Sequence, residues 1–353
     1  MLRVLMMAQR YKPYIGGVEK HVEQVAEALA RRNCKVTVLT TRPDARLPER
    51  ERVGATDIIR LPTGIDRNPL LLLKWFASNR EMMREFQIVH CHDFVPILLW
   101  ATPFRMVLPG RPIFATFHGY ERDPVPLYFK YIRKIAERLV RGSLCVGSFI
   151  ERVYGTNCFA TPIGAVPQTA KRASGKNHAI YVGRLEPDTP VLEYVEALAT
   201  VAGESKREME FTVCGDGSLR EKLEGMCQDR GVHARFLGNV RNPEPHYLNA
   251  DAALAGGFLS VLEAMSYGLP VIAYAGTALK HQYYESVLKA GGKISIQSSA
   301  AGVAREMERL LKFPKLHNHL SKRAVDFAEK NDWSRMANLY LNLWAEFTKD
   351  ALA

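Results

Sequence analysis

The sequence predicts an α/β protein made of two doubly wound domains, and three observations lead to that prediction. The chain has 353 residues, whereas a single hydrophobic core usually stops growing near roughly 250–300 residues. Short apolar runs alternate with amphipathic helical stretches through both halves, which is typical of a mostly parallel sheet covered by helices. A polar stretch at residues 167–177 separates the two series, so we expect the interdomain linker there.

The first domain, residues 1–167, opens with an expected strand at residues 2–7. The helix that follows carries its apolar residues on one stripe, formed by Val18, Val22, Val25, Ala26 and Leu29. Further β-rich runs predict strands at residues 35–40, 57–61, 88–92, 113–117 and 144–147. This strand–helix alternation predicts a Rossmann-like sheet.

The second domain, residues 168–331, repeats the alternation. Its apolar runs predict strands at residues 179–182, 210–214, 234–237, 251–254, 271–273 and 294–296, and helices near 300–312 and 314–330. A last helix, within residues 332–353, carries large apolar side chains at helical spacing: Trp333, Met336, Leu339, Tyr340, Leu343 and Trp344. Such a stripe predicts a helix that packs on one of the domains.

Composition indicates an ordinary globular protein, with 47% hydrophobic and 24% charged residues. The six cysteines are far apart and show no zinc-binding spacing, so we expect reduced thiols in a cytoplasmic protein. No apolar run approaches the ~18 residues that a membrane-spanning helix needs. The N-terminus does not resemble a signal peptide, because its apolar run is short.

The net charge of +11 is concentrated in the first half of the chain. Residues 1–170 hold 25 Lys and Arg against 15 Asp and Glu. Such asymmetry indicates a polyanionic neighbour, namely nucleic acid, an anionic membrane or phosphorylated substrates, unless it serves solubility alone. No nucleic-acid-binding motif is present, so we expect no nucleic-acid partner.

Several loops have residues suited to phosphate. Gly16 and Gly17 lie between a predicted strand and helix, where free N–H groups and the helix dipole favour an anion; a simple turn is the alternative. Arg184 follows a predicted strand, and a guanidinium there grips phosphate oxygens in two-pronged fashion, unless it forms a surface salt bridge. Gly215 and Gly217 permit a sharp turn from strand to helix.

Three histidines lie at the ends of predicted strands. His118 follows the strand at 113–117, and ligands of open α/β sheets bind beyond such strand ends, so it either hydrogen-bonds a ligand or is a surface histidine. His90 and His92 alternate along one strand and therefore share a face. A third metal ligand is not evident, so we expect no metal site.

A carboxylate and the end of a predicted strand complete the candidate site. Glu263 lies near a predicted helix start, and a carboxylate accepts two hydrogen bonds, which suits the paired hydroxyls of a ribose. Phe236 and Leu237 end a predicted strand, and Arg241 follows; it stacks on a nucleotide base or is simply solvated.

Together these segments resemble the retaining family-4 glycosyltransferases, also called glycosyl transferases group 1. The matching strings are Gly-Gly-Val-Glu at 16–19, Val-Gly-Arg-Leu at 182–185, Gly-Asp-Gly-Ser-Leu at 215–219, Phe-Leu-Gly-Asn-Val at 236–240 and the segment 257–273. The resemblance implies the GT-B fold, in which two Rossmann-like doubly wound domains face each other across a cleft. It also implies that the acceptor binds mainly to the first domain, the nucleotide sugar mainly to the second, and that the last helix crosses back to the first.

The resemblance further implies a retaining, metal-independent hexosyltransferase that uses a UDP- or GDP-sugar and no cofactor. The departing phosphate then takes the proton of the acceptor. The implied catalytic residues are His118, Arg184 and Glu263. The implied donor-binding residues are Gly16, Gly17, Arg184, Gly215, Gly217, Phe236, Leu237, Leu259, Ser260 and Glu263.

Two positions depart from the family pattern. Thr189 stands where the family has a lysine, and Ala255 stands where it has the first of two glutamates. A charge-assisted hydrogen bond contributes about 1.5–3 kcal/mol, so losing the lysine alone weakens diphosphate binding about 10- to 150-fold unless another cation compensates. The departures predict an altered activity or, alternatively, a catalytically silent GT-B subunit that binds a partner or a membrane.

A basic and apolar segment suggests an acceptor at a membrane. Cations at Lys130, Arg133, Lys134, Arg138 and Arg141 are interleaved with Tyr128, Phe129, Tyr131 and Ile132, a pattern that suits a helix lying on an anionic bilayer. Residues 70–73 with Trp75 and Phe76 are a second candidate, and core packing is the alternative for both. We therefore expect a lipid-linked or phosphorylated acceptor and a peripheral position at the inner membrane face.

Overall fold

A computed structural model describes residues 1–14, 16–162, 177–205 and 208–348. The chain divides into two compact units. Unit 1 comprises Met1–Pro162 together with Trp333–Ala353, and unit 2 comprises Ile163–Asp332. The linker expected at 167–177 lies outside the described residues, apart from Asn177.

The sheet of unit 1 has seven strands in the order β3-β4-β2-β1-β5-β6-β7. All neighbours pair in parallel except β3 with β4. The strands are β1 (Leu2–Ala8), β2 (Cys34–Thr40), β3 (Arg50–Val53), β4 (Thr56–Arg60), β5 (Ile88–His92), β6 (Ile113–Phe117) and β7 (Ser143–Cys145). The sequence did not predict β3, because this edge strand is largely polar and has no apolar run to reveal it.

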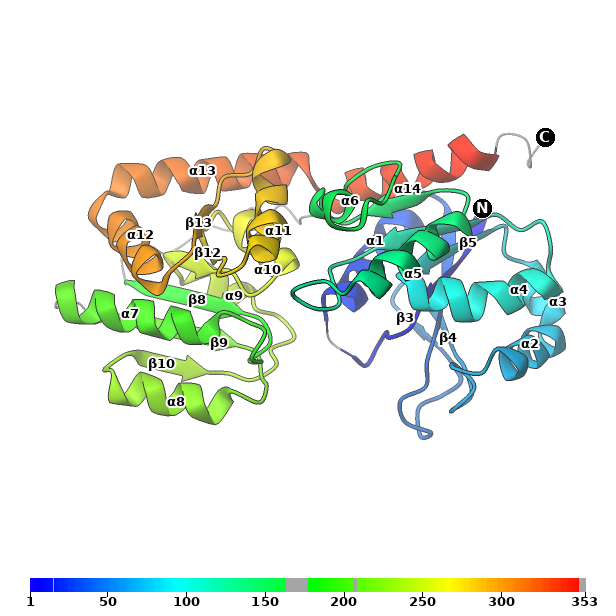
Figure 1. Ribbon diagram of the computed structural model, residues 1–353, viewed down its shortest axis with the longest axis horizontal. Helices are drawn as coiled ribbons and strands as arrows, with labels where there is room; N and C mark the ends of the chain where they lie inside the picture. The colour runs from blue at the N-terminus through cyan, green and yellow to red at the C-terminus, as the bar shows by residue number, and fades with distance from the viewer. Residues whose placement is uncertain (15, 163–176, 206–207, 349–353) are drawn as a thin grey trace. The chain divides into compact units, whose positions relative to one another are not determined.

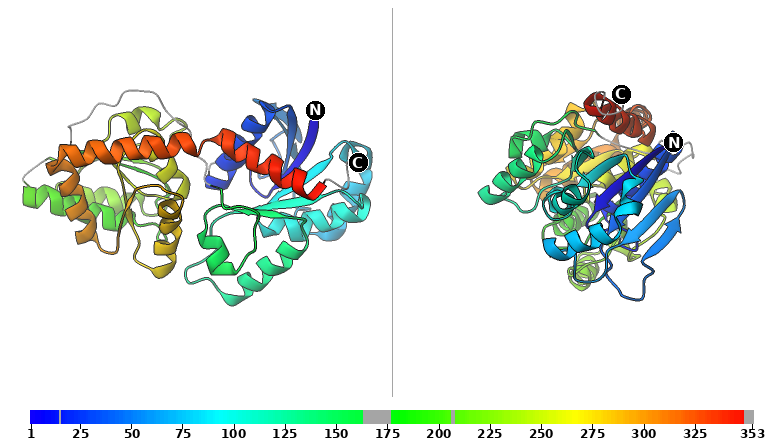
Figure 2. Two further views of the ribbon diagram at one scale, coloured as in Figure 1. Left: turned by 90° about the horizontal axis from the view of Figure 1, so that it is seen from above. Right: turned by 90° about the vertical axis from the view of Figure 1, so that its right-hand side faces the viewer.

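Helices pack on the sheet of unit 1 (Figure 1). They are α1 (Gly17–Ala30), α2 (Pro69–Ser78), α3 (Arg80–Arg84), the π-helical turn η1 (Pro96–Ala101), α4 (Thr102–Val107), α5 (Leu127–Arg138), α6 (Phe149–Tyr154) and α14 (Trp333–Thr348). The predicted stripe of α1 is buried. Helix α14 contacts α1 (Figure 2, red segment), and it buries Met336, Tyr340, Leu343 and Trp344.

Unit 2 has a six-stranded parallel sheet in the order β10-β9-β8-β11-β12-β13. The strands are β8 (His178–Val182), β9 (Glu210–Cys214), β10 (His233–Phe236), β11 (Ala252–Leu254), β12 (Val271–Tyr274) and β13 (Ser295–Gln297). The helices are α7 (Val191–Ser205), α8 (Arg220–Asp229), α9 (Glu244–Leu248), α10 (Phe258–Ser266), α11 (Ala278–Lys289), α12 (Ala300–Lys312) and α13 (Pro314–Lys330). The α/β class and the predicted strands of this half are confirmed.

The strand order reverses beside the first strand of each sheet. In unit 2, β9 lies on one side of β8 and β11 on the other; in unit 1, β2 and β5 flank β1 in the same way. Ligands of open parallel sheets bind beyond the carboxyl ends of the strands at such a reversal. The fold therefore points to the loops after β8 and β11 and to those after β1 and β5.

The cysteines and the helices have the features of an ordinary globular protein. All six cysteines are free thiols, and five of them are buried. None of the described helices combines the length and the apolar character needed to cross a membrane.

Candidate functional site

The loops after β8 and β9 lie directly against each other, and this contact requires glycine. A Cβ atom on Gly215 would lie 1.8 Å from the carbonyl oxygen of Gly183, and one on Gly217 would lie 2.4 Å from that of Leu185. The two glycines have φ angles of 157° and 159°, which side chains disfavour. Backbone bonds join the loops, from Leu185 N–H to Asp216 O (3.0 Å) and from Leu219 N–H to Leu185 O (2.9 Å).

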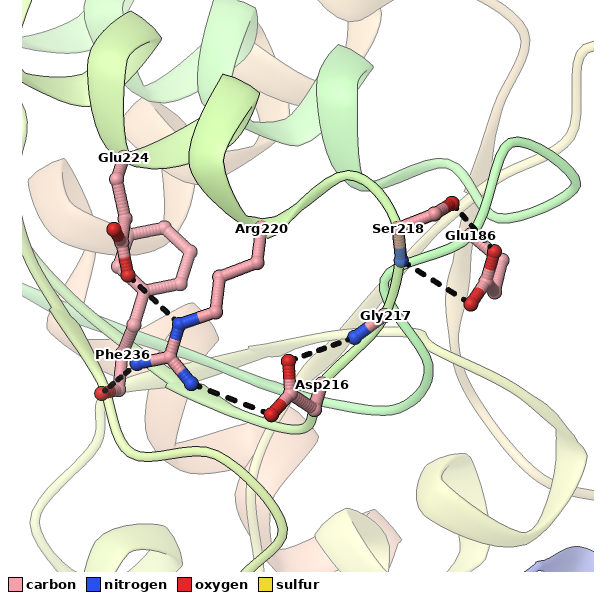
Figure 3. Close-up of polar contacts among 7 residues, drawn as sticks. All are labelled: Glu186, Asp216, Gly217, Ser218, Arg220, Glu224 and Phe236. Atoms are coloured by element: carbon pink, nitrogen blue, oxygen red, sulfur yellow. Dashed lines mark hydrogen bonds and ion pairs between the residues drawn. The ribbon is translucent and has the colours of Figure 1, made fainter.

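Side chains reinforce this pair of loops (Figure 3). The carboxylate of Glu186 accepts hydrogen bonds from the backbone N–H and the hydroxyl of Ser218, at 3.2 and 2.7 Å. Asp216 Oδ1 accepts from the N–H of Gly217 at 2.9 Å. The turn that presents Arg184 is thus tied to the turn of the next strand.

Arg220 extends the same network to β10 (Figure 3). Its guanidinium contacts Asp216 at 3.4 Å and Glu224 at 2.9 Å, and donates to the carbonyl oxygen of Phe236 at 3.3 Å. Arg220 was not predicted as a site residue. The signal was its i±4 spacing from Asp216 and Glu224, which puts all three on one side of the start of α8.

Arg184 is exposed immediately after β8. Its Nη2 forms an ion pair with Asp188 Oδ2 at 2.7 Å, and the two side chains are 67% and 66% exposed. The hydroxyl of Tyr181 donates to the Arg184 carbonyl oxygen at 2.7 Å, which fixes the backbone. An exposed pair of this kind contributes only ~0–1 kcal/mol, so Asp188 does little to hold the guanidinium in place.

The two departures from the family pattern have structural roles. The buried hydroxyl of Thr189 donates to the carbonyl oxygen of Glu186 at 2.7 Å and closes that turn. Ala255 is buried at the end of β11, and its carbonyl oxygen accepts from the hydroxyls of Tyr194 (3.0 Å) and Tyr284 (3.3 Å). Each position is thus part of the packing behind the candidate site.

Helix α10 starts beyond the carboxyl end of β11. Its N-cap residue is Gly257, and the intrahelical bonds begin with Val261 N–H donating to Gly257 O at 3.1 Å. The N–H of Phe258 already donates to the hydroxyl of Tyr283 at 2.5 Å. Leu259 and Ser260 lie in the first turn of this helix, and the first turn is the part of a helix where anions bind.

Glu263 lies one turn further along α10 and is half-buried. Its Oε2 accepts a long hydrogen bond, 3.4 Å, from the hydroxyl of Tyr247. Burial, with Glu263 nearby, raises the pKa of Tyr247 well above its usual range, so the phenol remains a donor. Phe236 is half-buried, and Leu237 and Arg241 are exposed, at the end of β10 and just after it.

The first-unit loop differs from a simple phosphate-binding turn. Gly16 caps α1, and an added Cβ there would lie 2.3 Å from Oε2 of Glu19, so the Glu19 carboxylate folds back onto the helix start. Burial raises the pKa of Glu19. A phosphate near Gly16 and Gly17 would have to displace this carboxylate, and the donor-binding role of the two glycines remains a prediction.

His118 is held from three directions. Its N–H donates to Asp93 Oδ1 at 2.7 Å, its Nε2 lies 3.0 Å from Nδ1 of His92, and the ring of His21 meets it edge-on at 4.7 Å. Burial lowers the pKa values of His92 and His118 well below the usual range, and raises that of Asp93 to about 7. Both imidazoles are therefore neutral at neutral pH.

His90 is structural, although it shares a face with His92 as predicted. The indole N–H of Trp344 donates to its Nδ1 at 3.1 Å, and its Nε2 lies 2.8 Å from Thr116 Oγ1. The hydrogen bonds continue from Thr116 to the hydroxyl of Tyr340 (2.7 Å), and that hydroxyl lies 3.0 Å from Nε2 of His21. Within the described ranges no group of three or more His, Cys, Asp or Glu could hold a metal ion.

Part of the predicted membrane-facing segment is wrong. Arg133 is buried: it donates to Glu121 at 2.7 Å and lies over the ring of Tyr154 at 3.8 Å. In α2, Leu72 and Phe76 are buried. Both cases follow from helical periodicity, which turns every third or fourth residue towards the core. The predicted residues that are exposed are Leu70, Leu71, Tyr128, Tyr131, Arg138 and Arg141, and α5 also exposes Leu127 and Ile135, which were not predicted.

Comparisons with known proteins agree with this architecture. The model of the family described as Glycosyltransferase Family 4 matches residues 15–162, and that of Glycosyl transferases group 1 matches residues 165–327. The phosphatidyl-myo-inositol mannosyltransferase of Mycobacterium leprae is 26% identical over 363 aligned residues, which cover 93% of this chain and 92% of that protein.

Two solved structures have the same fold. Sucrose-phosphate synthase from Thermosynechococcus elongatus superposes with a TM-score of 0.77 at 16% identity, covering 98% of this chain and 100% of the other. Anabaena HepE, solved with UDP and glucose, gives a TM-score of 0.74 at 12% identity over 98% and 100% of the two chains. The fold and the family models therefore define a GT-B glycosyltransferase that uses a nucleotide-sugar donor. Within that class, the chain belongs to the glycosyl transferases of group 1.

Proposed function

We propose that this chain transfers a hexose from a UDP- or GDP-sugar to a hydroxyl of a lipid-linked or phosphorylated acceptor, with retention of configuration. One observation carries the proposal. The Arg184 turn and the start of α10 follow β8 and β11, the adjacent strands at which the sheet order reverses, and ligands of such sheets bind there.

We assign roles by chemistry. Arg184 and the N–H groups of Leu259 and Ser260 bind the diphosphate, while Glu263 accepts from the ribose hydroxyls. Gly215 and Gly217 shape the loop beside Arg184, Phe236 and Leu237 border the base, and Gly16 and Gly17 are donor-binding residues. His118 hydrogen-bonds a hydroxyl of the transferred sugar.

The proposed reaction needs neither a side-chain base nor a metal. The acceptor oxygen bonds to the anomeric carbon on the face from which the diphosphate departs, and the bond from that carbon to the phosphate oxygen breaks. The acceptor proton passes to the departing phosphate oxygen, so the products are the glycoside and the nucleoside diphosphate. Arg184 and the helix start stabilise the charge that develops on the leaving group.

The acceptor class rests on relatives and on surface chemistry. The mycobacterial relative is named for a lipid acceptor, phosphatidyl-myo-inositol. Helix α5 exposes Leu127, Tyr131 and Ile135, which are spaced four residues apart, and carries Lys130 and Arg138. Apolar side chains flanked by cations suit contact with an anionic bilayer, and we propose a peripheral position at such a membrane.

One nucleoside diphosphate from a panel of UDP, GDP, ADP and CDP is expected to raise the melting temperature of the protein. A ligand at a hundred times its Kd stabilises the folded state by about 2.7 kcal/mol. Arg184→Ala removes a charge-assisted contact and should weaken that nucleotide about 10- to 150-fold. Thermal-shift titration measures both effects.

The matched control is Arg309→Ala, since Arg309 is also a partly exposed arginine of unit 2, paired with Glu306 at 2.9 Å. It should bind the nucleotide as the wild type does.

Glu263→Ala should abolish the preference for the ribonucleotide over its 2′,3′-dideoxy analogue. If no nucleotide shifts the melting temperature, the silent-subunit alternative replaces this proposal.

Vesicles rich in anionic phospholipid are expected to sediment the protein at low salt and to release it at high salt. Tyr131→Ser should weaken this binding at least about tenfold, because an apolar side chain that enters the bilayer contributes about 1.5–3 kcal/mol. Co-sedimentation with vesicles of increasing anionic content measures the effect.

Met106→Ser is the control, since Met106 is 68% exposed and Tyr131 is 70% exposed in the same unit. It should bind as the wild type does. Equal losses in the two variants, or no sedimentation at low salt, would disprove the membrane contact of α5 and leave the donor site unaffected.

A further inference from the structure

We infer that His92 fixes the tautomer of His118, so that His118 presents an Nδ1–H donor to an oxygen of the bound sugar. The second half of this inference rests on the proposed function, whereas the first half concerns the folded protein alone. His92 does not touch substrate in this scheme. It is a positioning residue that acts through His118.

The two rings share one hydrogen bond. His92 Nδ1, at the end of β5, lies 3.0 Å from His118 Nε2, just beyond β6. Both imidazoles are neutral, because burial disfavours the charged form. Each neutral ring carries one proton, so only two arrangements make this bond: His92 donates to His118, or His118 donates to His92.

The far side of His92 distinguishes the two arrangements. His92 Nε2 is buried and has no hydrogen-bond partner among the described residues. If His118 donated, the proton of His92 would sit on this Nε2 as a buried, unpaired N–H group. Orphaned buried N–H groups are rarer than under-satisfied acceptors, and leaving a donor unpaired costs its full desolvation. We therefore place the proton of His92 on Nδ1, donating to His118 Nε2.

The tautomer of His118 follows directly. Its Nε2 accepts from His92, so its own proton lies on Nδ1. The backbone on both sides of the ring is anchored, because the N–H of His118 donates to Asp93 Oδ1 at 2.7 Å and its carbonyl oxygen accepts from Arg133 at 3.4 Å. His118 is only partly buried, and with Nε2 bonded to His92 its Nδ1–H is the donor left for a ligand.

This arrangement has a mechanistic consequence. An Nδ1–H group donates to a sugar hydroxyl oxygen, and it has no lone pair with which to take a proton. His118 therefore orients the transferred sugar and does not act as a general base. The acceptor proton must then leave by another route, which agrees with its transfer to the departing phosphate.

Nitrogen-15 spectra of protein labelled in histidine test the tautomers directly. At pH 7.5 the side chains of His92 and His118 should both show protonated Nδ1 and unprotonated Nε2, with the signals assigned from their loss in His92→Leu and His118→Asn. An Nε2–H tautomer at His118 overturns the inference. This measurement needs no substrate, so it decides the tautomer whether or not the proposed transferase reaction is found.

Variants of His92 then test the consequence. His92→Leu removes the donor and should shift His118 towards the Nε2–H tautomer that a free histidine side chain prefers. It should lower kcat at least tenfold with UDP-glucose or GDP-mannose, whichever matches the base selected by the nucleotide panel. The affinity for the nucleoside diphosphate should not change, because its proposed ligands lie in unit 2.

His92→Asn provides the conservative comparison. The amide nitrogen of asparagine occupies the place of Nδ1 and donates in the same direction, so this variant should restore the Nδ1–H tautomer of His118 and most of kcat. Equal kcat losses in the leucine and asparagine variants, with tryptophan fluorescence showing that unit 1 is folded, would indicate packing alone and overturn the positioning role. A shifted tautomer with unchanged kcat would overturn the contact between His118 and the sugar.

Discussion

Gly215→Ala is expected to destabilise unit 2 by about 3 kcal/mol or more, because it combines an unfavourable backbone conformation with a steric clash. The added Cβ would lie 1.8 Å from the carbonyl oxygen of Gly183 and 2.9 Å from its carbonyl carbon, at a φ angle of 157°. Neither atom belongs to a flexible side chain, so the loops after β8 and β9 must separate. The backbone of Arg184 would move with them, and nucleotide affinity should fall as well.

The two units can be observed separately. All four tryptophans, Trp75, Trp100, Trp333 and Trp344, lie in unit 1. Calorimetry should show the unit 2 transition about 6–12 °C lower, whereas the tryptophan fluorescence transition should stay in place. Gly225→Ala is the matched control, because no atom lies within 4 Å of its added Cβ and its helical position should gain about 0.5–1 kcal/mol. Similar transitions in the two variants would refute the close contact of the two loops.

Acidification from pH 7 to pH 4 is expected to destabilise unit 1 by several kcal/mol, because it holds buried neutral histidines. Burial lowers the pKa values of His21 and His90 from 6.5 to about 3, and those of His92 and His118 also fall. Below pH 6.5 these histidines bind protons in the unfolded chain, whereas in the folded unit they stay neutral. Each such histidine removes up to about 1.4 kcal/mol of stability per pH unit until the folded pKa is reached.

Two carboxyl groups oppose this trend. Burial raises the pKa of Asp93 from 3.8 to about 7 and also raises that of Glu19. These two groups stabilise the folded unit at low pH, and this stabilisation is lost as the pH rises through their pKa values in the folded protein. Four histidines have lowered pKa values, whereas only two carboxyl groups have raised ones. The free energy of unfolding should therefore fall by about 1–3 kcal/mol per pH unit on acidification.

Urea unfolding followed by tryptophan fluorescence between pH 7 and pH 4 measures this slope. His90→Gln should reduce the slope by about one proton, whereas replacing the exposed His319 by glutamine should leave it unchanged. Unfolding free energies that are equal at pH 7 and pH 5 would contradict the neutral state of the cluster. The experiment therefore also tests the protonation state on which the His92–His118 hydrogen bond depends.

Local patterns in the sequence were sufficient for most of the fold. Apolar runs located the central strands, because a strand covered by helices on both faces must be apolar throughout. The edge strand β3 was missed, because its residues alternate between exposed and half-buried positions and are mostly charged. Short motifs placed Arg184, Gly215 and Glu263 at strand ends or on the helix that follows, since these features depend on neighbours in sequence.

The linear pattern was insufficient wherever the outcome depended on a distant partner. Arg133 has the spacing of a surface cation on an amphipathic helix, yet it is buried. Its guanidinium forms an ion pair with Glu121 and a cation–π contact with Tyr154. The roles of Arg220 and Asp188 also emerged only from their contacts. A charged residue is assigned to the surface by default unless its partner is known.

The sequence by itself determined two α/β units, all their strands except β3, and the loops with residues suited to a nucleotide sugar, because hydrophobic period and turn chemistry act over a few residues. Only the tertiary structure decided how the histidines are used. His92 meets His118, 26 positions later, and Thr116 meets Tyr340, 224 positions later, because β5, β6 and α14 are neighbours in space. Such pairs depend on strand order and helix docking, and these fix which side chains can hydrogen-bond to each histidine.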